Sequence, residues 1–115
     1  MKVSVIMLGV TDMNRSIAFY RDLLGLEVAT EGAEFTFLNG GGVTLALSRP
    51  HIQALGKEPG SVEVVFAVDH VRKSYEALRA KGVEFKNQPR PATGPQWAAN
   101  FADPDGHMLS IFGPE

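Results

Sequence analysis

Cysteine is absent from this 115-residue chain, and its absence excludes several kinds of chemistry. Without cysteine there is no disulfide framework, no thiolate nucleophile and no cysteine-ligated zinc. An excess of one charge is missing too, because 11 basic and 13 acidic side chains leave a net charge of −2. A surface that follows nucleic-acid phosphates needs a basic excess, so we expect no nucleic-acid partner.

Long hydrophobic runs are also missing. The apolar stretch at residues 3–10 is far shorter than the roughly 20 residues that cross a membrane, and it lacks the basic start and cleavage site of a signal peptide. We therefore expect a cytoplasmic protein without a membrane partner. No phosphate loop, coenzyme fingerprint or nucleophile triad is visible. The 44% hydrophobic and 21% charged residues that remain are typical of one globular domain.

The first half of the chain predicts one helix among four strands. Asp12 is a good N-cap, Met13, Ile17 and Tyr20 recur at helical spacing, and Gly25 is a good stop. The strands are expected at residues 3–10, 26–30, 35–38 and 43–48.

The second half repeats this order. Asp69 can cap a helix that contains Val71, Tyr75 and Leu78 and that Gly82 ends. The strands are expected at residues 62–68, 83–85, 97–102 and 108–112. A fixed offset between the halves indicates an internal repeat, in which each half is a β-α-β-β-β module.

We expect one domain over residues 1–115. Module 1 spans about 1–48, a linker loop with two prolines and two glycines spans 49–61, and module 2 spans about 62–115. Neither module is expected to bury its sheet alone, so the two must pack together. That packing can occur within one chain or across a homodimer.

Two segments resemble a known family. One begins at Val10-Thr11-Asp12-Met13 and continues through Phe19-Tyr20-Arg21-Asp22-Leu23-Leu24-Gly25, and the other is the turn Asp103-Pro104-Asp105-Gly106-His107. They resemble the opening and closing motifs of the vicinal-oxygen-chelate superfamily, the glyoxalase, bleomycin-resistance and dioxygenase-like proteins. The resemblance implies an α+β fold of two β-α-β-β-β modules whose curled, barrel-like sheets surround a central cavity. It also implies a homodimer. At His107 the family usually has Asn, so we expect an unusual backbone conformation there.

The resemblance also implies where metal ligands would lie. In metal-using relatives four ligands converge on the cavity, and their positions fall here on Val5, Ala46, Glu63 and Ser110. Val5 and Ala46 carry no donor atoms, and a neutral serine hydroxyl is a weak ligand. We therefore expect neither a metal nor another cofactor at this site.

Strand alternation places further side chains toward the cavity. The resemblance implies that Phe35 and Phe37 join them, by analogy with the family's third strand. We predict a ligand-binding set of apolar residues with a few polar groups, namely Met7, Phe35, Phe37, Thr44, Ser48, Glu63, Asn100, Met108, Ser110 and Phe112. Such a lining suits an aromatic or planar small organic ligand. The alternative is that these side chains fill the barrel as core. Alternation puts Trp97 on the packed side, with a place at the cavity mouth as the alternative.

Glu63 is the only candidate for a catalytic role. Its carboxylate could recognise a ligand amine or act as a general acid or base. The alternative is a strand-end residue in water, paired with a lysine or arginine.

We favour a protein that binds a small apolar or aromatic molecule without metal, and drug sequestration is one form of this function. A metal-dependent lyase, isomerase or dioxygenase of the same superfamily is the main alternative, and a metal-free enzyme that uses Glu63 is a third. Whether the protein is an enzyme therefore stays open.

Overall fold

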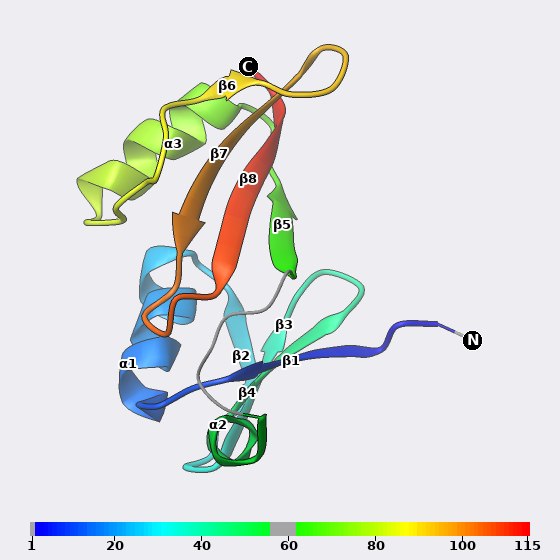
Figure 1. The fold of residues 1–115 in the computed structure, drawn as a ribbon, viewed down its shortest axis with the longest axis vertical. Coiled ribbons are helices and arrows are strands. Elements are labelled where there is room, and N and C mark those ends of the chain that lie inside the picture. Colours follow the sequence, from blue (N-terminus) through cyan, green and yellow to red (C-terminus); the bar gives the residue numbers. More distant parts are fainter. Residues whose placement is uncertain (1, 56–61) are drawn as a thin grey trace. The chain divides into compact units, whose positions relative to one another are not determined.

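The computed structural model describes residues 2–55 and 62–115 of the chain, with the side chains of 53–55 left out (Figure 1). The chain forms two compact units, Met1–Glu58 and Pro59–Glu115. Each unit contains one four-stranded mixed sheet with helices packed against it. An α+β fold made of two similar modules is thereby confirmed. No helix in the described part of the chain is long and apolar enough to cross a membrane.

The sheet of the first unit has the strand order β1-β4-β3-β2. Only β1 and β4 run parallel, and the other neighbours are antiparallel. The elements are β1 (Val5–Gly9), α1 (Met13–Ile17), the π-helix η1 (Ala18–Leu23), β2 (Glu27–Thr30), β3 (Phe35–Asn39), β4 (Thr44–Ser48) and α2 (Arg49–Leu55).

The helical segment of the first unit begins and ends where the sequence predicts. Asp12 Oδ1 accepts a hydrogen bond from the Arg15 N–H at 3.1 Å, which is N-cap geometry. Gly25 ends the segment with a φ of 79°, a conformation that glycine adopts without strain. Between them α1 widens into η1, where the Leu24 N–H bonds to the Phe19 carbonyl five residues back.

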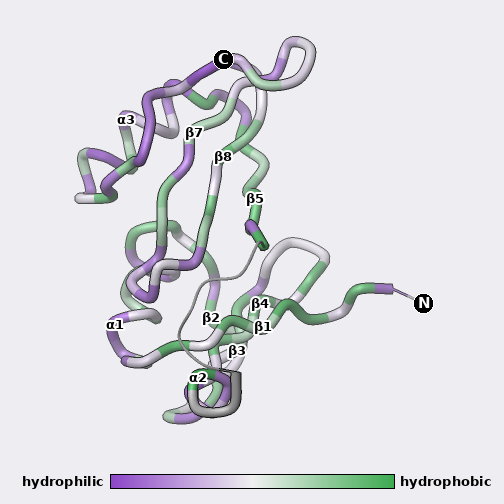
Figure 2. The backbone as a smooth tube through the Cα atoms, in the orientation of Figure 1, coloured by the Kyte–Doolittle hydropathy of each residue, from purple (hydrophilic) through white to green (hydrophobic). Residues whose placement is uncertain are grey.

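The sheet of the second unit has the order β5-β8-β7-β6, with β5 and β8 parallel. Its elements are β5 (Glu63–Ala67), α3 (Val71–Ala80), β6 (Arg90–Pro91), β7 (Gln96–Ala102) and β8 (Met108–Pro114). Figure 2 shows α3 with hydrophilic and hydrophobic segments in alternation, as expected for a helix with one face on a sheet.

The start of α3 differs from the expectation. His70, not Asp69, is the N-cap residue, and its backbone is extended at φ −147° and ψ 110°. His70 is the residue that matches Asp12 in the repeat, so the geometry of the cap is repeated although the capping side chain is not. Gly82 ends the helix with a φ of 101°, as predicted.

The strand expected at 83–85 does not form. Only Phe85 bridges β7, opposite Phe101, and the next contact is the Lys86 N–H to the Asn100 carbonyl at 2.7 Å. The edge strand β6 forms instead between the segments that were expected as strands at 83–85 and 97–102. It is two residues long and contains Pro91, a residue that a sheet tolerates at its edge.

The segment expected as a linker loop starts with the helix α2. Ser48 Oγ accepts a hydrogen bond from the His51 N–H at 3.3 Å, so Ser48 is an N-cap, and Pro50 lies in the first turn, where its missing N–H has no partner to lose. Ser48-Arg49-Pro50-His51 is therefore a helix start. The expectation of a loop, which rested on the two prolines and two glycines of residues 49–61, is wrong for residues 49–55. Residues 56–61 of the expected linker lie outside the described residues.

The closing turn also corrects an expectation. No described residue other than glycine has a positive φ, so His107 does not occupy an unusual conformation. Gly106 takes it, with a φ of 86°. Asp103 Oδ1 closes the turn by accepting hydrogen bonds from the N–H groups of Asp105 and His107.

Candidate functional site

Each sheet has a packed face and an open face. In the first unit the packed face lies against α1 and is lined by buried side chains, namely Leu8, Thr36, Leu38, Leu45 and Leu47. On the opposite face the register places Met7, Ala46 and Phe37 in one row across β1, β4 and β3. Met7 is 36% exposed and Phe35 40% exposed. The predicted binding residues Met7, Phe35, Phe37 and Thr44 therefore share an open, largely apolar face.

Ser48 shares the parity of that face but is covered. It is fully buried, and Ile52 of α2 packs over the neighbouring Gly9, where an added Cβ would lie 3.0 Å from the Ile52 side chain. The Ser48 hydroxyl is hydrogen-bonded to His51 Nδ1 at 2.9 Å. We therefore leave Ser48 out of the site proposed below, because α2 uses its hydroxyl as a cap.

The open face of the second sheet brings five of the predicted residues together. Register rows join Glu63 to Met108, Val65 to Ser110 and Asn100, and Ala67 to Phe112 and Ala98. Val65 is 54% exposed, and Ser110 is buried between its neighbours. Figure 2 shows β5 as mainly hydrophobic apart from a hydrophilic start. Apolar surface thus surrounds a small group of polar side chains.

The other face of this sheet packs against α3. The Arg72 guanidinium lies over the Trp97 ring, 5.3 Å from its centroid, so Trp97 belongs to the helix side. Phe85 packs between Tyr75 and Phe101, with ring centroids 4.7 and 5.0 Å away. The placement of Trp97 on the packed side is what strand alternation predicts.

Three polar side chains form a line across the open face of the second sheet. Asn100 Nδ2 donates to Glu63 Oε1 at 3.3 Å, and Arg90 Nη2 donates to Asn100 Oδ1 at 3.1 Å. The backbone of Asn100 is also held in place, because its backbone N–H donates to Asn87 Oδ1 at 2.8 Å. The line Glu63–Asn100–Arg90 thus runs from β5 over β8 and β7 to β6.

Arg90 is the residue that the sequence reasoning missed. Its guanidinium is joined to the Glu63 carboxylate through the Asn100 amide. Its segment, residues 87–95, contains three prolines and shows no strand pattern, so alternation could not assign Arg90 to a face. Only its pairing with Ala98 of β7 shows that it shares the open face with Asn100.

The donor set does not fit the metal that the family fold implies. Of the four equivalent positions, Val5 and Ala46 lie on the open face of the first sheet and offer carbon only. Glu63 and Ser110 lie on the open face of the second sheet, where a single carboxylate is the only strong ligand. Within residues 2–55 and 62–115 no three His, Asp or Glu side chains are grouped to hold an ion.

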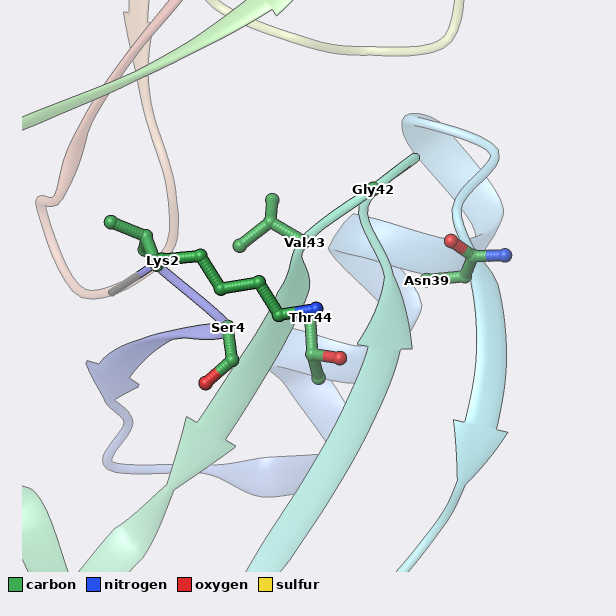
Figure 3. Close-up of a pocket in the computed structure, with 7 residues that line it drawn as sticks. Lys2, Ser4, Asn39, Gly42, Val43 and Thr44 are labelled. Atoms are coloured by element: carbon green, nitrogen blue, oxygen red, sulfur yellow. The ribbon is translucent and has the colours of Figure 1, made fainter.

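A polar cavity lies at one end of the first sheet. It has a volume of about 300 Å³ and is lined by Lys2, Val3, Ser4, Asn39, Gly42, Val43 and Thr44. Figure 3 shows the Lys2 side chain extending past Ser4 toward Thr44. Thr44 is the only predicted binding residue in this lining, and no aromatic or methionine side chain takes part. We do not assign the predicted site to this cavity.

Comparison with known proteins agrees with the fold. Residues 2–111 match the profile of the Glyoxalase/Bleomycin resistance protein/Dioxygenase superfamily. The Bacillus subtilis protein named "Uncharacterized protein YraH" is 31% identical over 97% of this chain and 98% of its own length. A glyoxalase-related enzyme from Fulvimarina pelagi has 26% identity and a TM-score of 0.83, over 97% of this chain and 87% of that chain. A superfamily member from Nocardioides has 26% identity and a TM-score of 0.80, over 98% and 83%. The chain therefore belongs to the Glyoxalase/Bleomycin resistance protein/Dioxygenase superfamily.

Proposed function

We propose that the protein binds a small apolar or aromatic molecule, without a metal ion, on the open face of its second sheet. The observation that carries this proposal is the exposed apolar surface around Glu63, Asn100 and Arg90. The opposite face of the same sheet is packed under α3, whereas Val65 is left 54% exposed. Exposed apolar surface that is interrupted by ordered polar groups is typical of ligand-binding surfaces.

The apolar and polar parts of this face have different roles. Burial of ligand surface on Val65, Met108 and Phe112 contributes about 25 cal/mol per Å² before the costs of association. One charged hydrogen bond to Glu63 contributes roughly 1.5–3 kcal/mol and fixes the orientation of the ligand. The open face of the first sheet, with Met7, Phe35 and Phe37, is a second apolar surface for the same class of compound. Drug sequestration, which the family name suggests, is one use of such binding.

The metal-dependent lyase, isomerase or dioxygenase is the weaker alternative. Val5 and Ala46 cannot coordinate an ion, and Ser110 is a poor ligand. Glu63 holds one hydrogen bond from Asn100, and within the described residues it belongs to no group of three or more acidic or histidine side chains that could hold an ion. The donor chemistry therefore favours binding.

A thermal-shift screen tests this function. Planar cationic drugs and neutral aromatic metabolites are screened with the full chain, both in EDTA and with added divalent metal. We expect hits that do not depend on metal. Calorimetry should then show about tenfold weaker binding to Glu63→Gln, because one charged hydrogen bond is lost.

Glu76→Gln is the matched control. Glu76 is an exposed carboxylate on α3, the layer opposite the proposed site, and its substitution should leave the affinity unchanged. If the only hits are anionic diols or thiol conjugates, and these hits require added metal, the binding function is wrong and a metal-dependent enzyme is favoured.

A further inference from the structure

The Glu63–Asn100–Arg90 line has opposite charges at its two ends. Asn100 uses its amide oxygen toward Arg90 and its amide nitrogen toward Glu63, so its orientation is set from both sides. The side chains of Arg90 and Glu63 have no other hydrogen-bond or ion-pair partner among the described residues. The line therefore presents a cationic end and an anionic end on one face of the sheet.

Both ends retain hydrogen-bonding capacity. A guanidinium has five N–H donors, and Arg90 spends one on Asn100. An ionised carboxylate has about four acceptor sites, and Glu63 spends one. A guanidinium can also hold a carboxylate through two parallel hydrogen bonds, which a single surface lysine cannot do. Each end can thus receive a charged ligand group without breaking the line.

The side chains between the two ends leave room for a flat group. Ala67, Phe112, Ala98 and Arg90 form one register row, in which Phe112 is flanked by two alanines. The row of Glu63 contains Met108 and Ala102. Because its neighbours Ala67 and Ala98 are small, the Phe112 ring lies on an apolar surface without tall side chains beside it in that row. An aromatic ring of a ligand stacks favourably on such a phenyl group.

On these grounds we infer that the site selects an amphoteric planar molecule: an aromatic compound with a carboxylate or carbonyl directed at Arg90 and a basic or N–H group directed at Glu63. This inference rests on the function proposed above and narrows its ligand class from apolar or cationic compounds to those with both kinds of group.

The test uses a matched series of small aromatic probes in NMR titrations of the full chain. The probes are 3- and 4-(aminomethyl)benzoate, benzylamine, benzoate and benzyl alcohol. At least one amphoteric isomer should bind about tenfold or more tightly than benzylamine or benzoate, because it makes both charged contacts. Arg90→Met should lower its affinity to that of benzylamine, and Glu63→Gln should lower it to that of benzoate.

Two further measurements separate recognition from a purely structural role of the line. Lys73→Met removes an exposed positive charge from α3 and should change no affinity. Arg90→Met should weaken the amphoteric probes and benzoate far more than benzylamine, whereas a structural role would weaken every probe equally. If Arg90→Met does not fold, Arg90→Lys replaces it in the same titrations. Arg90→Lys should bind only the aminomethylbenzoates and benzoate more weakly.

The outcomes distinguish the two proposals. Probes that bind with no preference for the amphoteric isomers, or that respond alike to Arg90→Met, overturn the amphoteric class and leave the binding function standing. If no aromatic probe binds the wild-type protein without metal, both proposals are wrong.

Discussion

Ser48 Oγ lies 2.9 Å from His51 Nδ1 and also accepts the His51 backbone N–H at 3.3 Å. The Ser48 hydroxyl makes both contacts and caps the start of α2, the helix that covers Gly9 on the first sheet. Ser48→Ala should lower the free energy of unfolding by about 1–2 kcal/mol, because the cap is lost inside a buried site. Urea denaturation measures the change. Ser4→Ala, an exposed serine of the same unit, should stay within about 0.5 kcal/mol of wild type.

The contact between Gly9 and Ile52 should show energetic coupling. An added Cβ at Gly9 would lie 3.0 Å from Ile52 Cδ1 and Cγ1, so Gly9→Val forces α2 outward. We expect a loss of about 1–3 kcal/mol of unfolding free energy from this overpacking. In the double variant with Ile52→Ala the loss should be clearly smaller than the sum of the single losses. Strict additivity would mean that α2 does not pack on β1 as described.

The closing turn should depend on the Asp103 carboxylate. Its Oδ1 accepts the N–H groups of Asp105 and His107 at 2.9 and 2.8 Å. Asp103→Ala leaves these donors without that acceptor and should lower the unfolding free energy by roughly 1–3 kcal/mol. Asp103→Asn keeps an acceptor oxygen, so its unfolding free energy should lie between those of the wild type and Asp103→Ala. Equal midpoints for all three proteins in urea would contradict this account of the turn.

The purified protein should contain far less than one divalent metal ion per chain. Val5 and Ala46 stand where metal-using relatives have ligands, and a single carboxylate does not hold a catalytic ion. Elemental analysis for zinc, iron, nickel and manganese is the measurement. One equivalent of any of these metals, lost on Glu63→Ala, would show that the metal-free assignment is wrong.

We also predict a homodimer at micromolar concentration. Within the described residues, β1, β2, β5 and β6 are edge strands, and Val5 and Phe35 are exposed on the first sheet. Unpaired edges and exposed apolar side chains favour pairing with a second copy. Light scattering should therefore give twice the chain mass of 12.4 kDa, and a monomer mass would refute the prediction.

Much of the fold follows from local sequence. The caps at Asp12, Gly25 and Gly82 depend on a few consecutive residues, so they can be recognised without tertiary information. Strand alternation likewise assigns Met7, Thr44 and Asn100 to the open faces, because the period of two holds along any regular strand. The absence of donor atoms at Val5 and Ala46 is a property of the sequence itself.

Only the tertiary structure decided whether Arg90 and Ser48 belong to the candidate site. Arg90 became part of the candidate site only because two residues of a proline-rich segment pair with β7, which sets its side chain beside Asn100. Ser48 shares its parity with the predicted binding residues, yet α2 folds back over it and uses its hydroxyl. In both cases the deciding contact joins elements whose approach depends on packing, and periodicity along one strand carries no information about what covers that strand.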